Sequence, residues 1–341
     1  MARQSFPKYT SGFSLVEIMV ALTLSLLLLG AVLQVFMSAK ASYRMNEGLA
    51  RLQETGRFAA NILAGDIRMA GYQGCMTLDK IEPNVIVEDP PNDLNLYDSA
   101  HILLGENDLA ATNTLGAVTG SDSLTIRGAS AVNAHLTGNM DSDNANIQID
   151  GNPAGFEADD ILMITDCADA DIFRATNVSN PDGKITIAHA SGNTVNRLSK
   201  AYQSDAQVMA FESTTYYVAD SNRDNEAGDP IYSLYVQQLG DTVELVAGVE
   251  NMQVLYGVDT DADGSVDNYA NAGAVADFTN VLSVRVALLV SSVAPATTQA
   301  DTATYTLLDE TVDPANGRYL RNVFTFTATA RNRSLRSTMF N

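Results

Sequence analysis

The chain has 341 residues, of which 46% are hydrophobic, as in a folded protein that can bury a sizeable core. Its formal net charge of −21 argues against nucleic acid or an anionic lipid surface as a partner of the bulk of the chain. The three histidines are scattered and the two cysteines form no CxxC pair, so the sequence also argues against a zinc site.

We expect a short leader peptide over residues 1–12. It contains Arg3 and Lys8 and no acidic residue. Positive charge ahead of a first membrane span favours a cytoplasmic N-terminus. Lys40 and Arg44 lie beyond the apolar run that follows, so the charge asymmetry alone is weak.

The apolar run extends from Ile18 to Ala39 and contains no Asp, Glu, Lys, Arg or Pro. At ~1.5 Å per residue, a helix of this length crosses a hydrocarbon core of ~30 Å. A secretory signal peptide instead has an apolar region of roughly 7–15 residues with a small-residue cleavage site after it. Here the candidate cleavage signal lies before the apolar run instead of after it. We therefore expect a transmembrane helix over residues 13–39.

Glu17 stands at the start of the apolar segment, four residues after Phe13. A charged side chain costs ~2.5–3.5 kcal/mol at the centre of a span and less near its end, and such residues usually have a partner or a function. The alternative is a carboxylate that only reaches the headgroups. The residue by itself does not separate the two interpretations.

The surrounding residues, Gly12-Phe13-Ser14-Leu15-Val16-Glu17 followed by Ile18-Met19-Val20-Ala21-Leu22, resemble the prepilin signature of type IV pilins and type II secretion pseudopilins. The resemblance implies that a membrane aspartyl peptidase cuts after Gly12 and that the new N-terminal residue, Phe13, is N-methylated. It also implies an assembly role for Glu17. In a dry helical core its carboxylate would pair with the Phe13 amine of a neighbouring subunit, because an unpaired buried charge is costly. An internal pair is the alternative, since the two residues are one helical turn apart.

Helical patterning continues after the span, and we expect a soluble half of the same helix over residues 40–70. The helix should end near Ala70-Gly71, with glycine as the C-cap. Gly48, Gly56 and Gly65 weaken this stretch by up to ~1 kcal/mol each, and are either tolerated or sites of bending. The expected apolar stripe is Met45, Leu49, Leu52, Ala59, Leu63 and Ala70.

Residues 71–341 should form a β-rich head, because short β-branched or aromatic segments alternate with Gly, Asn, Asp and Pro. The expected fold class is α+β: a long N-terminal helix packed on a mainly antiparallel sheet. Asp89-Pro90-Pro91-Asn92 is expected to be a loop. The predicted strands are Ser123–Arg127, Ile147–Asp150, Ile161–Thr165, Ile172–Asn177, Ile185–His189, Val208–Glu212, Thr215–Ala219, Ile231–Val236, Val243–Val246, Val249–Val258, Val281–Ser291, Tyr305–Leu308 and Tyr319–Arg331.

Later motifs resemble the PilW branch of minor pilins: Gly56-Arg57-Phe58, Asp66-Ile67-Arg68-Met69-Ala70-Gly71-Tyr72 with Gly74-Cys75, Tyr319-Leu320-Arg321-Asn322-Val323-Phe324, and Ala330-Arg331-Asn332-Arg333. The chain is longer than a typical major pilin and has no proline between Pro7 and Pro83, which favours a low-copy subunit.

The PilW resemblance implies a non-enzymatic protein that primes pilus assembly near the tip and supports motility or adhesion. Its partners would be other minor pilins, the major pilin, the prepilin peptidase, the inner-membrane assembly platform and a tip adhesin. It would cross the bacterial inner membrane once, with its head in the periplasm, and then enter the pilus at the cell surface. The alternatives are a type II secretion pseudopilin and a membrane-anchored adhesin or enzyme outside any filament.

The same resemblance places Cys75 and Cys167 in similar positions to cysteines of PilW-like chains. An exported head meets an oxidising compartment, and two cysteines permit one intramolecular pairing. We expect a disulfide that joins the end of the helix to the region of Ile161–Thr165. The alternative is two free buried thiols.

An acidic loop, Asp259-Thr260-Asp261-Ala262-Asp263-Gly264-Ser265-Val266-Asp267, matches the first nine positions of a calcium loop. The carboxylates of Asp259, Asp261 and Asp263, the backbone carbonyl of Ser265 and an oxygen of Asp267 would be the ligands. Ala270 stands where the loop normally has a bidentate glutamate, so the predicted affinity for Ca²⁺ is weak. The alternative is a solvated acidic turn.

The end of the chain, from Arg318 to Asn341, is basic and has five arginines and no acidic residue. It is expected to be either a solvated end or a surface that docks against an acidic neighbour. No catalytic signature of the common hydrolase, metalloprotease or nucleotide-binding kinds occurs in the sequence.

Overall fold

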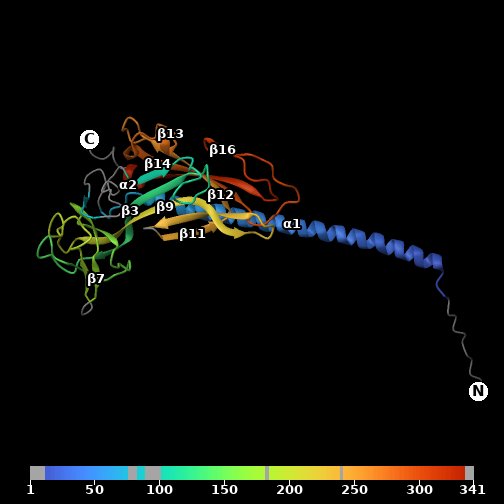
Figure 1. Ribbon diagram of the computed structural model, residues 1–341, viewed down its shortest axis with the longest axis horizontal. Coiled ribbons are helices and arrows are strands. Elements are labelled where there is room, and N and C mark those ends of the chain that lie inside the picture. Colours follow the sequence, from blue (N-terminus) through green and yellow to red (C-terminus); the bar gives the residue numbers. More distant parts are fainter. Residues whose placement is uncertain (1–11, 76–82, 89–100, 181–183, 239–240, 335–341) are drawn as a thin grey trace, which may run out of the picture.

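The computed structural model describes residues 12–75, 83–88, 101–180, 184–238 and 241–334. One long helix, α1 (Leu15–Met69), projects from a β-rich head and packs along it with its C-terminal half (Figure 1). The predicted α+β class is confirmed. Most of the leader, with Arg3 and Lys8, the loop at Asp89–Asn92 and Arg336 lie outside the described residues.

The two halves of α1 meet different surroundings. Its buried residues all lie between Gly48 and Ile67, and the apolar half before them is wholly exposed. The mean hydropathy of that half reaches 2.4 over an 18-residue window, enough to cross a membrane by length and composition. The helix ends one residue earlier than expected, with Ala70 as C-cap, and Gly71 follows in the left-handed conformation at φ 71°.

The face of α1 that meets the head differs from the predicted apolar stripe, because it includes two glycines. Met45 and Leu49 are 46% and 45% exposed, whereas Gly48 and Gly56 are buried against the head. A Cβ on Gly56 would lie 2.5 Å from the ring of Phe324. The glycines are therefore points of close approach between helix and sheet, not tolerated defects, because the period of the apolar residues cannot tell where the head begins.

A four-stranded antiparallel sheet packs against α1, in the order β13-β12-β14-β17. Its two central strands, β12 and β14, are largely buried on both faces, and their inward residues join Leu52, Ala59, Leu63 and Ile67 of α1 in the main core. The bounds are β12 Val249–Val258, β13 Asn268–Ala270, β14 Val281–Ser291 and β17 Arg321–Thr329.

A larger sheet of eight strands lies beside it, with the path β1-β6-β5-β9-β10-β11 and with β3 paired to both β2 and β9. All its pairings are antiparallel except that of β1 with β6. The bounds are β1 Asn84–Val85, β2 Leu103–Glu106, β3 Ser123–His135, β5 Ile161–Thr165, β6 Ala170–Arg174, β9 Gln207–Asp224, β10 Pro230–Gln238 and β11 Asp241–Ala247.

Short elements complete the head. A three-stranded sheet covers a second core that it shares with β5, β6 and β9, and a two-stranded hairpin packs on the outer face of β14. The bounds are β4 Ile147–Ile149, β7 Asn177–Ser179, β8 Ile185–Ala188, β15 Tyr305–Leu307, β16 Glu310–Val312, the 3₁₀ turns η4 Ala272–Ala274 and η5 Phe278–Asn280, and the helix α2 Arg331–Ser334.

Four strand predictions need correction. Val208–Glu212 and Thr215–Ala219 are one strand, β9, because the polar residues between them still pair with β3 and β10. Ile172–Asn177 spans the end of β6 and the start of β7. The last predicted strand, Tyr319–Arg331, is shorter at both ends.

Asp122 joins the two sheets. Its Oδ1 accepts a hydrogen bond from the Asp108 backbone N–H at 2.9 Å, and its Oδ2 accepts one from Val254 N–H in β12 at 2.7 Å. Burial raises the pKa of this carboxyl to about 7, against the opposing effect of the two backbone donors.

Candidate assembly site

The predicted processing site lies at the free end of α1. Gly12 and Phe13 precede the helix, and Phe13 is 84% exposed. A side chain added at Gly12 would meet nothing within 4 Å. Neither residue is covered by the described part of the head, so the bond between them is open to an approaching peptidase.

Glu17 caps its own helix. Its Oε2 accepts a hydrogen bond from the Ser14 backbone N–H at 3.1 Å, and Ser14 Oγ accepts one from Val16 N–H at 3.3 Å, which together make a capping box. The pattern Ser-x-x-Glu, from Ser14 to Glu17, is the signal in the sequence that corresponds to this cap. The motif glutamate therefore orders the first helical turn in an isolated subunit.

The cap leaves Glu17 able to take a second partner. A carboxylate can accept hydrogen bonds at about four positions, and the cap uses one of them. A negative charge at a helix N-terminus is also favoured by the helix dipole. An amine from a neighbouring chain could thus pair with this carboxylate without undoing the helix.

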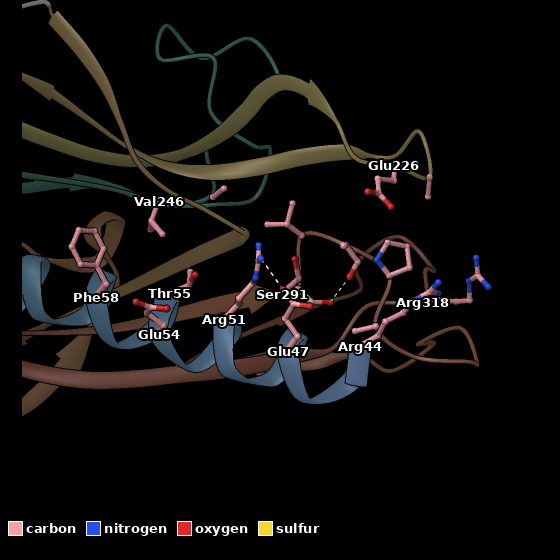
Figure 2. Close-up of a pocket in the computed structure, with 18 residues that line it drawn as sticks. Arg44, Glu47, Arg51, Glu54, Thr55, Phe58, Glu226, Val246, Ser291 and Arg318 are labelled. Atoms are coloured by element: carbon pink, nitrogen blue, oxygen red, sulfur yellow. Dashed lines mark hydrogen bonds and ion pairs between the residues drawn. The ribbon is translucent and has the colours of Figure 1, made fainter. Parts of the chain in front are cut away.

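A groove of about 860 Å³ opens where α1 enters the head (Figure 2). One wall is the exposed side of α1, and the facing side is made by the turn between β9 and β10, the end of β11 and the segment after β14. The groove was not predicted, because it joins segments far apart in the sequence. Its lining residues include Arg44, Glu47, Arg51, Glu54, Thr55, Phe58, Glu226, Val246, Ser291 and Arg318.

Charges of both signs line this groove. Arg51 pairs with Glu47 at 2.8 Å along the helix, and both side chains remain largely exposed. Phe58, 47% exposed, adds an apolar end to the groove. A surface that mixes paired charges with an exposed aromatic ring is typical of a protein contact rather than of a small-molecule pocket.

The predicted disulfide is confirmed. Cys75 and Cys167 are bonded, with 5.2 Å between their Cα atoms and a sequence separation of 92. Cys167 lies in the turn between β5 and β6 and has a left-handed backbone at φ 71°. The bond ties the chain just after α1 to the eight-stranded sheet.

The basic end is not simply solvated. Arg321 is almost fully buried and pairs with both oxygens of Glu250, at 2.7 and 3.2 Å, and with Asp301 at 3.0 Å. Arg333 is buried too and donates to the Phe278 carbonyl. These two arginines are used inside the head, which composition alone could not reveal.

The acidic loop brings together three of its five predicted ligand residues. Carboxylate oxygens of Asp259, Asp261 and Asp267 lie within 4.8 Å of one another, while the Asp263 carboxylate is not part of that group. Asp263 Oδ1 instead accepts a hydrogen bond from Ser265 N–H at 2.7 Å. Ca²⁺ at this loop remains a prediction.

Two family models match the chain. Residues 7–33 match the prokaryotic N-terminal methylation motif, and residues 215–332 match the type IV pilus-assembly protein W, PilW. Neither is a family of enzymes. No curated protein and no solved structure gives a significant match.

A methylation motif that leads into one long apolar helix, followed by an antiparallel β head, defines a pilin-like protein made as a prepilin. The second match covers the strands that pack on α1, from within β9 to the start of α2. Within the pilin-like class, the two matches support a PilW-type protein, and the PilW match itself covers residues 215–332.

Proposed function

We propose that the chain is a minor pilin, cut after Gly12 and methylated at Phe13, that primes assembly of a type IV pilus and remains near its tip. Its head would lie in the periplasm and then at the cell surface, where it supports motility or adhesion. Its partners would be the prepilin peptidase, the inner-membrane assembly platform, other minor pilins, the major pilin and a tip adhesin. It performs no catalysis in this role.

The main observation in support of this proposal is the exposed apolar half of α1. No described part of the head covers it, so it needs either lipid or the helices of other subunits around it. A membrane holds it before assembly, and a helical filament core offers an equally apolar environment afterwards. Glu17 is then the one charge that has to be neutralised when the helix leaves the membrane.

Three variants test the role of Glu17. Glu17→Gln keeps an oxygen that can accept the Ser14 N–H but removes the charge, whereas Glu17→Ala removes both. Ser14→Ala removes the other half of the cap and keeps the charge. Because removing one partner of a buried ion pair costs ~3–5 kcal/mol, both Glu17 variants should enter sheared filaments at least about tenfold less often than wild type.

Ser14→Ala should assemble within about twofold of wild type, because an exposed cap stabilises a helix by only ~1 kcal/mol. Membrane fractionation and disulfide formation serve as controls for insertion and folding. Normal filament recovery of Glu17→Gln would disprove the pairing. A deletion strain that loses protein secretion and keeps twitching motility would favour the pseudopilin alternative.

A further inference from the structure

The hairpin between β12 and β13 holds an acidic loop, residues 259–267, that the assembly role does not use. Three carboxylates from separate points of the loop converge, those of Asp259, Asp261 and Asp267. Ala262 and Gly264 take left-handed backbone conformations, with φ 62° and 88°, and allow the tight turn between them. Like charges held this close repel one another unless a cation lies between them.

Asp259 is the member of the group whose burial points to a bound ligand. It is only 7% exposed, and its Oδ2 accepts a hydrogen bond from Gly264 N–H at 2.9 Å. Its Oδ1 is buried, and no donor among the described residues reaches it. A buried carboxylate oxygen without a donor is costly, so a ligand at this oxygen would remove a specific penalty.

We propose that Asp259, Asp261 and Asp267 bind a calcium ion, with Asp259 Oδ1 as the innermost ligand. All three donors are carboxylate oxygens, which suit a hard cation. Oxygens that lie ~2.3–2.6 Å from one ion are at most about 5 Å apart, and this group meets that limit. Calcium fits better than magnesium, because it accepts an irregular set of ligands.

Asp267 is already oriented for this role. Its Oδ2 accepts hydrogen bonds from the Thr260 hydroxyl at 2.6 Å and from the Thr260 N–H at 2.7 Å. These two bonds fix the orientation of the Asp267 carboxylate in the loop.

Binding at this loop would act on more than the loop. The backbone N–H of Asp259 donates to the Asn280 carbonyl in η5 at 2.9 Å. In the same turn, the ring of Phe278 packs edge-on against Tyr256 with centroids 5.1 Å apart, and its carbonyl accepts from Arg333. An ion that fixes Asp259 therefore also fixes the contact between η5, β12 and α2.

The test uses the full-length chain in detergent, stripped with chelator and then titrated with CaCl2 or MgCl2. With a dissociation constant of about 10⁻⁴–10⁻³ M, 10 mM calcium should raise the Tm by about 3–6 °C. Asp261→Asn, at an exposed position, should weaken calcium binding at least about tenfold. Asp313→Asn removes one charge from an exposed residue elsewhere and should leave binding unchanged.

Asp263→Ala separates this site from a standard calcium loop, in which an aspartate or asparagine oxygen at position 263 is a ligand. This variant leaves no side-chain oxygen at position 263, so the three-carboxylate site should still bind calcium within about threefold of wild type. A loss equal to that of Asp261→Asn would overturn the three-carboxylate assignment. The same Tm rise with magnesium, or no rise with calcium, would overturn the calcium site itself.

Discussion

Gly56 offers a direct test of how closely α1 lies against the head. Gly56→Ala adds one methyl group on the helix face that meets β17. That group would lie 2.5 Å from Phe324 Cδ2 and Cε2 and 2.6 Å from Cγ. Carbon atoms in favourable contact are ~3.5–4.0 Å apart, so the ring or the helix has to move by about 1 Å.

The size of the effect follows from two opposing contributions. Forcing an extra methyl group into a packed interface costs ~1–3 kcal/mol, because Cγ is close to the β17 backbone and cannot swing away. Alanine in place of glycine returns up to ~1 kcal/mol of helix propensity. We therefore expect Gly56→Ala to destabilise the protein by about 1–2 kcal/mol.

Gly65→Ala is the matched control, because a Cβ there meets nothing within 4 Å. It should gain the same propensity without the clash and stabilise the protein by up to ~1 kcal/mol. The two variants should thus differ in Tm by about 4–8 °C. Thermal unfolding of the full chain in detergent can be followed by tyrosine fluorescence, since the chain has 13 tyrosines and no tryptophan.

The double variant Gly56→Ala with Phe324→Leu completes a double-mutant cycle with the two single variants. A smaller, flexible side chain at position 324 should make the added methyl group less costly, which gives a favourable coupling energy. Equal Tm values for Gly56→Ala and Gly65→Ala would refute the close approach of α1 to β17.

Two further outcomes follow from the disulfide and from Asp122. Cys75→Ser opens a loop of 92 residues and should lower the free energy of unfolding by ~4–5 kcal/mol in the chain-entropy model, measured by denaturation with and without reductant; an unchanged midpoint would contradict this. The raised pKa of Asp122, from 3.8 to about 7, means that folding favours its protonated form, so its contribution to stability is greatest below pH 4 and declines as the pH rises to 7. Asp122→Asn should therefore show a smaller loss of Tm between pH 5 and pH 8 than wild type, and equal slopes would contradict the shift.

Much of the fold could be predicted from local patterns. The apolar runs Val249–Val258 and Val281–Ser291 gave the bounds of β12 and β14 because turn-forming residues enclose them. Short strands such as β1 and β13 were missed, since two or three residues carry no readable period. Their pairing depends on partners far away in the sequence.

The sites show the same division. The prepilin motif is contiguous, so sequence was sufficient to find Glu17, and the disulfide had one possible pairing. Which loop carboxylates converge depends on backbone turns at Ala262 and Gly264, and the choice of three among four was not predictable. Burial of Arg321 likewise depends on Glu250, 71 residues away.

The geometry of α1 sets how the protein would respond to mechanical load. Its contact with the head runs from Gly48 to Ile67, about 30 Å along the helix axis at ~1.5 Å per residue. A pull on the exposed end is parallel to this contact, so its buried side chains share the force in shear instead of separating one by one. Any force that passes beyond Met69 reaches Cys75 and crosses a covalent bond to the turn between β5 and β6. In the oxidised head the tension therefore bypasses the chain between Cys75 and Cys167, whereas in the reduced head it has to pass along that chain.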